Sequence, residues 1–343
     1  MYFYKPKYKL REWIDESKLD WYELSYQPRA IDLLLKNQNK IFWPGFSCNT
    51  SAVDFLSENG DKINWPGLSE NVEAIDILKK HKDQINWCVL SENEAAEELF
   101  REHPEKVKLY FVQSNKGALN FILDYVVPNC YELYIERMRL IEIEGIENIE
   151  LEHPSDVDFL LQTHLARLSS NENAMDFLLQ NPKLIDFYYL SSNTDYRAVK
   201  LCKENLNKLN WMSLCENENP EAIEILKNNQ HNIHWYILSE NKSAYNILME
   251  NLHKINWDTA SANPVLIDLL YKNQDKIEWQ WFSTNPEIFV IDYEYFYNRL
   301  NKRKNDNSIS LCEELMQVVF HPKRLVYHMS NYNYDIDSDM YLN

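Results

Sequence analysis

The stretch Lys254-Ile-Asn-Trp-Asp-Thr-Ala-Ser-Ala-Asn-Pro-Val-Leu-Ile-Asp-Leu-Leu-Tyr-Lys-Asn-Gln-Asp275 is one copy of a unit that recurs along most of the chain. Eight of the 10 tryptophans occupy the same position of this unit: Trp21, Trp43, Trp65, Trp87, Trp211, Trp235, Trp257 and Trp279. Copies are 22 residues long, except for two of 24. A fixed period is typical of a solenoid, because one short unit cannot bury its own apolar face and must stack on its neighbours.

Asparagine follows six residues after the tryptophan position in nearly every copy, and only the first copy differs, with Gln27. The asparagines of the tryptophan-bearing copies are Asn49, Asn71, Asn93, Asn217, Asn241, Asn263 and Asn285. In the middle of the chain Leu109, Leu165 and Phe187 take the tryptophan position, and Asn115, Asn171 and Asn193 still follow. The repeat therefore continues where its aromatic residue is lost.

Two helices per copy are predicted from the spacing of apolar residues. These stand 9, 10, 12 and 13 positions after the tryptophan, as in Ala74, Ile75, Ile77 and Leu78, which describes one helical face. The preceding asparagine is suited to an N-cap, and Pro28, Pro264 and Pro286 to the first helical position. This predicts a helix of about ten residues that ends at an asparagine such as Asn37 or Asn273.

A shorter helix is expected to begin at the tryptophan. The alternative is a strand at Ile63-Asn64-Trp65, as in leucine-rich repeats, but the prolines of Trp43-Pro44-Gly45 and Trp65-Pro66-Gly67 would interrupt a sheet ladder. We therefore predict an all-α fold, an α-solenoid of about a dozen short helical hairpins with a 22–24-residue period. Stacked at about 8–10 Å, these hairpins would form an elongated or curved body about 100 Å along its path.

The predicted organisation has five parts. Residues 1–17 form an N-terminal cap, in which Trp13 and Ile14 cover the open end of the first repeat. Regular helical repeats occupy 18–115 and 159–297, and degenerate repeats occupy 116–158. Residues 298–343 form a C-terminal capping helix and tail.

Each repeated side chain has a structural and a functional interpretation. The tryptophan row is predicted to be core rather than an aromatic ligand platform. The asparagine row is predicted to cap helices rather than line a polar groove. Serine recurs four residues after the tryptophan without a fixed histidine or carboxylate, so a structural role is predicted for Ser25, Ser47, Ser69, Ser91, Ser239, Ser261 and Ser283.

Two charged rows accompany the repeat, and both are predicted to be solvated faces or exposed ion pairs. An acidic row lies 11 residues after the tryptophan, at Asp32, Asp54, Asp76, Glu98, Asp176 and Asp268. A lysine row lies three residues before it, at Lys18, Lys40, Lys62, Lys106, Lys208, Lys254 and Lys276. As ladders, these rows could help to select a partner.

Composition excludes several classes of function. A formal net charge of −18 and a pI near 5.0 argue against a nucleic-acid groove. The six cysteines form no C-x-x-C pair, the start Met1-Tyr-Phe-Tyr-Lys-Pro6 is no apolar leader, and no long apolar run follows, so we expect a reduced, cytoplasmic location without a membrane span. His231-Asn-Ile-His234 lacks a third ligand, and phosphate-loop, HExxH and GxSxG motifs are missing. No catalytic residue, metal or cofactor is expected.

The phrase Lys-Leu/Ile-x-Trp-x-x-Leu-Ser-x-Asn-Pro-x-Ala-Ile-x-Leu-Leu, seen at 18–34 and 254–270, resembles the tandem repeats of uncharacterised proteins of mimivirus-like giant DNA viruses. The segments Lys9-Leu-Arg-Glu-Trp-Ile14 and Glu313-Glu-Leu-Met-Gln-Val-Val-Phe-His-Pro-Lys-Arg-Leu325 are similar to segments of the same proteins. The resemblance implies a viral source, and hence the host cytoplasm or a virion as location. It implies no reaction.

The expected function is a non-enzymatic protein–protein interaction scaffold whose partner is an unidentified host or viral protein. The alternatives are a structural component of a virion and an enzyme with its site in the irregular segment 116–158. The two 24-residue copies place their extra residues in the same turn, and insertions in solenoids often map to the binding face. The candidate contacts are Thr194, Asp195, Tyr196, Glu218 and Asn219, with Tyr196 as an aromatic anchor. Neutral lengthening of exposed turns is the alternative interpretation.

Overall fold

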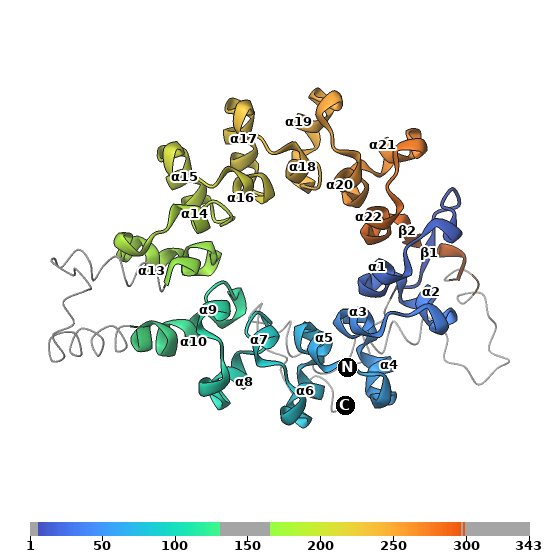
Figure 1. Ribbon diagram of the computed structural model, residues 1–343, viewed down its shortest axis with the longest axis horizontal. Coiled ribbons are helices and arrows are strands. Elements are labelled where there is room, and N and C mark those ends of the chain that lie inside the picture. The colour runs from blue at the N-terminus through green and yellow to red at the C-terminus, as the bar shows by residue number, and fades with distance from the viewer. Residues whose placement is uncertain (1–5, 131–164, 296–297, 299–343) are drawn as a thin grey trace, which may run out of the picture. The chain divides into compact units, whose positions relative to one another are not determined.

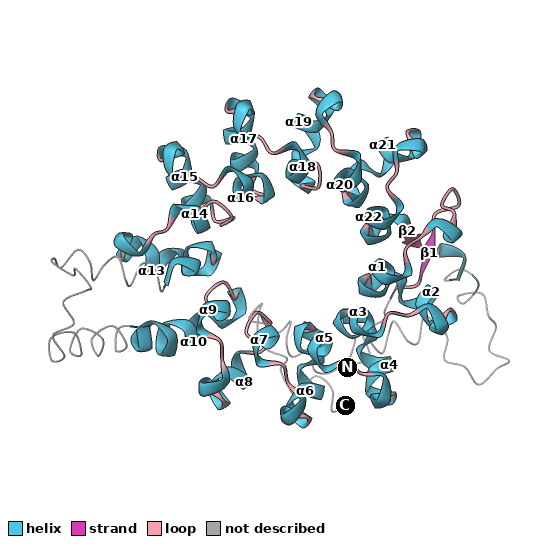
Figure 2. Ribbon diagram, in the orientation of Figure 1, coloured by secondary structure: helices cyan, strands magenta, loops and turns pink. Residues whose placement is uncertain are grey.

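The computed structural model describes residues 6–130, 165–295 and 298, and it divides into two compact bodies. The repeat body comprises Asp15–Ile288, and the terminal body comprises Met1–Ile14 with Phe289–Asn343. Short helices joined by tight turns make up the described part of the repeat body (Figure 1, Figure 2). The prediction of helices rather than strands in the repeats is confirmed.

A first helix, here called helix A, begins at the tryptophan position of each repeat, or one residue later in the Leu165 copy. Its copies are α1 (Trp21–Tyr26), α3 (Trp43–Cys48), α5 (Trp65–Glu70), α7 (Trp87–Leu90), α9 (Leu109–Val112), a 3-10 helix (Ala166–Ser170), α14 (Phe187–Leu190), α16 (Trp211–Glu216), α18 (Trp235–Leu238), α20 (Trp257–Ala262) and α22 (Trp279–Thr284). The residue before the tryptophan often caps this helix, as Asn64 does by accepting the Gly67 N–H at 2.9 Å.

A second helix, helix B, follows. Its copies are α2 (Ile31–Lys36), α4 (Val53–Glu58), α6 (Ile75–Lys80), α8 (Glu97–Glu102), α10 (Leu119–Phe121), α13 (Met175–Gln180), α15 (Tyr196–Glu204), α17 (Pro220–Asn228), α19 (Tyr245–Glu250) and α21 (Ile267–Lys272). Helix α21 ends at Asn273 as predicted, and the Asn273 Nδ2 donates to the Leu269 carbonyl at 2.8 Å.

The start of helix B differs from the prediction. In most 22-residue copies its first three residues form a 3-10 turn, such as Pro28–Ala30 or Pro264–Leu266, before a six-residue α-helix. Another 3-10 turn, such as Gln38–Lys40, connects helix B to the next helix A. In the two 24-residue copies the extra residues replace the first turn, because Asp195 and Asn219 act as new N-caps of the continuous nine-residue helices α15 and α17.

The core runs along the stack between the two rows of helices. One buried side chain from helix A and one from helix B fill it at fixed positions of the repeat, and in most copies these residues are leucines. Leu24, Leu34, Leu56, Leu68, Leu78, Leu90, Leu214, Leu226, Leu238 and Leu248 are all fully buried. Each repeat therefore completes the core of its neighbours rather than a core of its own.

The irregular middle of the chain leaves the stack of repeats uninterrupted. Asn171 Nδ2 donates to the carbonyls of Gln113 and Asn115 at 3.2 and 2.9 Å, so its repeat stacks directly on the repeat of α9. Residues 116–130 supply the second helix of the α9 repeat, including a π-helical turn at Ile122–Val126. The remainder of the predicted degenerate segment 116–158 lies outside the described residues.

The repeat body closes on itself, because α1 packs against α22 (Figure 1). The Asp20 N–H donates to Ser283 Oγ at 2.8 Å, as the Phe42 N–H donates to Ser25 Oγ at 3.0 Å between neighbouring repeats. The expectation of an open end to the stack is therefore wrong for this body. Helices A line the inner side of the resulting ring of repeats, and helices B lie on its outer side (Figure 1).

The terminal body contains a two-stranded antiparallel sheet that was not predicted. Strand β1 (Tyr8–Leu10) pairs with β2 (Phe289–Ile291), with Tyr8 opposite Ile291 and Leu10 opposite Phe289. The chain enters β2 directly after the 3-10 turn Pro286–Ile288, where other repeats continue into helix B. The predicted C-terminal helix and tail, residues 298–343, lie outside the described residues except for Asn298.

Candidate interaction surface

The serine row joins neighbouring repeats. Ser25 Oγ donates to the Trp21 carbonyl at 2.7 Å and accepts the Phe42 N–H of the next repeat at 3.0 Å. The same contacts recur in other copies, and the serines are fully buried. In the Trp211 copy Cys215 replaces the serine, and its sulfur accepts the His234 N–H at 3.4 Å. The predicted structural role of this row is confirmed.

The asparagine row caps helix B and also binds the preceding repeat. Asn71 Oδ1 accepts the Glu73 N–H at 3.0 Å, which is the predicted cap. Its Nδ2 donates to the carbonyls of Ser47 and Asn49, each at 3.0 Å. The first copy carries the longer Gln27, whose Nε2 donates to the Thr284 carbonyl at 2.8 Å, where the ring closes. Capping alone therefore does not account for this row.

The tryptophan row packs against the core without being fully buried in it, as Trp211, Trp235 and Trp257 show, so the prediction that it is core holds in part. All eight tryptophans are half-buried, whereas the largest fully buried side chains are phenylalanines and leucines. Helix A begins at the edge of each junction, so its first side chain keeps one ring face toward the next repeat. Lys40 Nζ lies 4.1 Å from the centroid of the Trp21 ring in this way.

The lysine row is largely exposed, as predicted, but it also covers these aromatic faces, a contact that the prediction did not include. Each lysine lies over the aromatic residue of the preceding repeat at 4.1–5.5 Å, a cation–π geometry. The pairs are Lys18–Trp279, Lys40–Trp21, Lys62–Trp43, Lys106–Trp87, Lys208–Phe187, Lys254–Trp235 and Lys276–Trp257. The first of these pairs spans the ring closure.

The acidic row on helix B is mostly exposed and includes two exposed ion pairs, in agreement with the prediction. Glu98 pairs with Lys79, and Asp176 pairs with Arg197. The side chains of Glu98 and Asp176 are 67% and 82% exposed. Pairs this exposed contribute about 0–1 kcal/mol each to stability.

The predicted binding residues lie together, but the side chains of three of the five form hydrogen bonds within the repeat body. Asn219 Nδ2 donates to the Thr194 carbonyl at 2.9 Å, which joins the two lengthened turns. The Thr194 hydroxyl bonds Glu172. Asp195 Oδ1 accepts the Arg197 N–H at 2.7 Å, and its hydrogen bonds with Arg197 lower the pKa of the Asp195 carboxyl.

The other two predicted residues are exposed. The Tyr196 side chain is 67% exposed, with the Arg197 guanidinium 5.8 Å from its ring centroid. Glu218 lies 3.4 Å from Lys242 of the next repeat. Tyr196 is therefore the side chain of this group that is most available to a partner.

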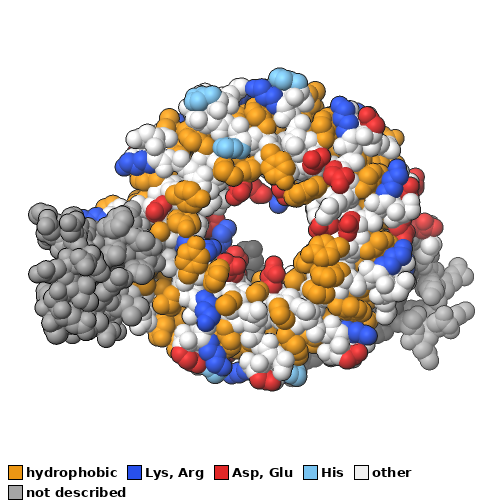
Figure 3. Space-filling view, in the orientation of Figure 1, with side chains coloured by type: hydrophobic (Ala, Val, Ile, Leu, Met, Phe, Trp, Pro, Cys, Tyr) orange, Lys and Arg blue, Asp and Glu red, His pale blue; other side chains and the backbone are white. Residues whose placement is uncertain are grey.

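Helix A carries a more extensive surface, here called the helix A face, that the sequence analysis missed. It consists of the positions one and five residues after the tryptophan, which lie one helical turn apart. Apolar or aromatic side chains that are 48–59% exposed occupy the first position at Tyr22, Tyr110, Tyr188, Met212 and Tyr236. Exposed carboxylates occupy the second at Glu70, Glu92, Glu216 and Glu240. Hydrophobic and acidic side chains are visible around the inner edge of the ring (Figure 3).

The charged residues of helix A are mostly carboxylates. Across the described copies, the six residues that start at the tryptophan position include six carboxylates and one arginine. The carboxylates are Glu23, Glu70, Glu92, Glu216, Glu240 and Asp258, and the arginine is Arg167. The signal was present in the sequence, but it emerges only when both positions are assigned to one exposed face.

Arg167 is held on this surface by residues of the preceding repeats. Its guanidinium carbon lies 4.6 Å from the Tyr110 ring centroid and 5.8 Å from that of Phe111. Its Nη2 lies 3.4 Å from a Glu92 carboxylate oxygen and donates to Ser114 Oγ at 3.1 Å. A hydrogen bond with Tyr189, and then the Arg167 charge, lower the pKa of Tyr110.

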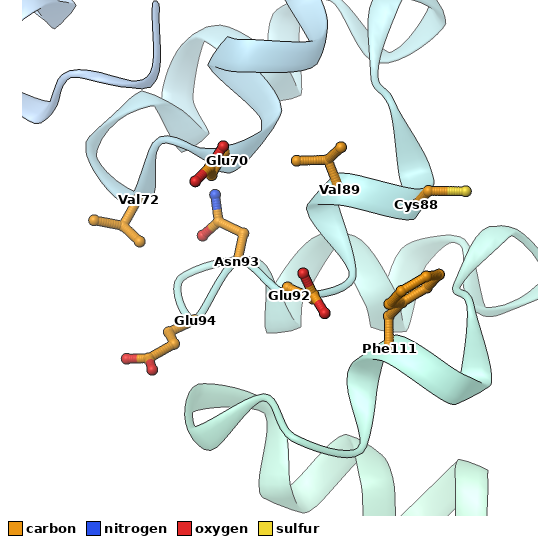
Figure 4. A pocket seen from close by; sticks show the side chains of 8 residues that line it. All are labelled: Glu70, Val72, Cys88, Val89, Glu92, Asn93, Glu94 and Phe111. Carbon is orange, nitrogen blue, oxygen red and sulfur yellow. The ribbon is translucent and has the colours of Figure 1, made fainter. Parts of the chain in front are cut away.

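A groove of about 500 Å³ opens between α5, α7 and α9. Its lining combines apolar side chains with carboxylates: Glu70, Val72, Cys88, Val89, Glu92, Asn93, Glu94 and Phe111. Val89, Glu92 and Phe111 come from α7, its following turn and α9, with Glu70 and Val72 of the preceding repeat opposite them (Figure 4). This lining is suited to a side chain with an apolar stem and a positive end.

Residues 6–130 and 165–295 show few features of a metal site or of a reactive thiol. Those residues contain no group of three or more His, Cys, Asp or Glu side chains that could hold a metal ion. Burial raises the pKa of the Cys202 thiol to about 12 and also raises that of the Cys215 thiol, so both stay protonated at neutral pH. In the same part of the chain no helix is long and apolar enough to cross a membrane.

Comparisons with protein-family models, curated proteins and solved structures found no match for this chain. The surfaces of the repeat body are therefore the basis for its proposed function.

Proposed function

We propose that the repeat body is a non-enzymatic scaffold that binds a protein partner through the helix A face. The row of exposed aromatic and apolar side chains at one position of helix A supports this proposal most directly. Tyrosine side chains combine a large apolar area with a hydroxyl group, and they are enriched among the residues that dominate binding energy at protein interfaces. Because the row recurs from repeat to repeat, several contacts can act on one partner.

Because the repeat phrase resembles proteins of giant DNA viruses, we propose a host or viral protein as the partner, in the host cytoplasm or in a virion. The same scaffold could serve as a structural component of the particle. The enzyme alternative assigns its site to residues 116–158, most of which lie outside the described residues.

The test compares tyrosines on the two sides of the ring. The variant Tyr188→Ser/Tyr236→Ser removes side chains from the helix A face that are 59% and 52% exposed. The matched control Tyr245→Ser/Tyr271→Ser removes tyrosines from helices B of α19 and α21 that are 45% and 52% exposed. We expect quantitative pull-down from infected-cell lysate to show proteins that the first variant loses and the control keeps.

Equal retention of every captured protein by both double variants would contradict the proposal. A third variant, Tyr196→Ser, tests the lengthened turns separately. If this variant alone loses the partner, the interface lies at the insertions rather than on the helix A face.

A further inference from the structure

Arg167 shows how the helix A face holds a positive charge. An exposed tyrosine from one repeat supplies the aromatic surface, and a carboxylate from the repeat before it supplies the ion pair. Arginine is suited to this site because its planar guanidinium stacks on an aromatic ring while its N–H groups bond a carboxylate. The chain thus contains one occupied example of an arginine site.

A second place on the face has the same types of groups, and none of the described arginines occupies it. Helix α16, which carries Met212 and Glu216, packs against helix α18, which carries Tyr236 and is followed by Glu240. The Tyr236 ring is 52% exposed. The position equivalent to Arg167 in the following repeat is Thr259, whose hydroxyl donates to the Tyr236 carbonyl at 2.6 Å.

The carboxylates at this second place repel one another. Burial, and then the charge of Glu216, raise the pKa of Glu240. Lys242, which acts on Glu240 in the opposite direction, lies 3.4 Å from Glu218. Asp258, one residue after Trp257, adds an exposed carboxylate in the next repeat. A positive group bound from outside would relieve this repulsion.

We infer that the helix A face between α16 and α20 binds an arginine-bearing basic segment of a protein partner. A guanidinium then lies against Tyr236 and between the carboxylates of Glu216 and Glu240, as Arg167 lies against Tyr110 and beside Glu92. This inference rests on the proposed function and specifies the chemistry of the partner. A second copy of this chain, with its formal charge of −18, and a nucleic acid both carry the wrong sign of charge.

The test measures binding of a dye-labelled peptide of alternating arginine and glycine residues by fluorescence anisotropy. Salt is kept at about 0.15 M, where the Debye length is about 8 Å, so that general attraction to an acidic chain is screened. We expect Glu216→Lys/Glu240→Lys to weaken binding at least about tenfold. The control Glu221→Lys/Glu224→Lys on α17 changes the net charge equally, and its affinity should stay within about twofold of the wild type.

Two further measurements address stacking and folding. Tyr236→Ser should weaken binding of the arginine peptide more than binding of the equivalent lysine peptide, because lysine lacks a planar group that stacks on the ring. If Glu216→Lys/Glu240→Lys loses its helical circular dichroism signal, Glu216→Gln/Glu240→Gln is used in its place. This variant should also weaken binding of the arginine peptide.

Several outcomes would overturn the inference. The inference fails if the arginine peptide does not bind the wild type. It also fails if Glu216→Lys/Glu240→Lys and Glu221→Lys/Glu224→Lys weaken peptide binding equally. Tighter peptide binding after serine replaces Arg299, Lys302, Arg303 and Lys304 would identify a basic segment of this chain as the occupant instead. If tyrosines of the helix A face govern partner capture but the peptide does not bind, the inference fails and the proposed function stands.

Discussion

At the scale of single residues, the asparagine row shows why one residue type recurs. Its amide oxygen caps helix B of its own repeat, and its amide nitrogen donates to carbonyls of the preceding repeat. Aspartate is an equally good cap, but its ionised carboxylate has no hydrogen to donate. The pattern predicted the cap correctly. It could not reveal the second bond, because that bond depends on how repeats stack.

Replacement of Asn71 by aspartate separates these two roles. Asn71→Asp keeps the cap oxygen but places a buried charge beside the carbonyls of Ser47 and Asn49, so we expect a loss of about 2 kcal/mol or more. The matched control is Asn64→Asp, because the Asn64 oxygen caps α5 by accepting the Gly67 N–H. That change should alter stability by less than about 0.5 kcal/mol. Urea unfolding followed by circular dichroism measures both, and equal effects would leave capping as the sole role of the row.

The tryptophan and lysine rows explain where the sequence analysis was incomplete. A large aromatic residue at a fixed position indicates core, but burial depends on where helix A starts relative to the junction. Trp21 lies at that edge, half-buried, with Lys40 over its ring. The lysine was assigned to solvent because its contact is made in a different repeat, 19 positions away in the sequence, which no local pattern reveals.

At the scale of elements, the sequence predicted that two helices exist in each copy, where helix A begins and where helix B ends. The 3-10 turn at the start of helix B was missed, because a three-residue turn barely changes the spacing of apolar residues. The helix A face was missed for a different reason. Its aromatic and acidic positions vary from copy to copy, as with Tyr236 in one repeat and Asp258 in the next, so neither position forms a uniform row.

The lengthened turn before α15 gives a pH-dependent prediction. Hydrogen bonds from Arg197 lower the pKa of Asp195, so the ionised carboxylate stabilises the folded state above its unfolded pKa of about 3.9 and loses this effect as pH falls through the folded value. We expect Asp195→Asn to lower the free energy of unfolding by about 1–2 kcal/mol at pH 7. The difference from wild type should shrink below about pH 3.9.

The control for this prediction is Asp176→Asn, because Asp176 pairs with the same Arg197 but its side chain is 82% exposed. We expect it to change stability by less than about 0.5 kcal/mol at either pH. A difference between wild type and Asp195→Asn that stays constant from pH 7 to pH 3 would show that the Asp195 charge does not act in this way.

At the scale of the whole repeat body, closure depends on a small rotation between neighbouring repeats that accumulates along the stack. The sequence repeat does not reveal the size of that rotation. One signal was present. The first copy carries Gln27 where the others carry asparagine, and this residue meets the last repeat. The junction otherwise uses the same kinds of contact as every other junction, as the bond from Asp20 to Ser283 shows.

Closure predicts a covalent cross-link between residues far apart in the sequence. Arg29 Nη1 lies 2.8 Å from Glu287 Oε1, so an Arg29→Lys variant treated with a zero-length carbodiimide should join residues 29 and 287. Lys227 and Glu250, 3.1 Å apart in adjacent repeats, provide an internal control for the reaction. Mass spectrometry of a mixture of ¹⁴N and ¹⁵N protein distinguishes bonds within one chain from bonds between chains. An open stack would yield the 227–250 product without the 29–287 product, and exchange between molecules would yield 29–287 products of mixed isotope. A ring closed within one chain yields both products with a single isotope in each.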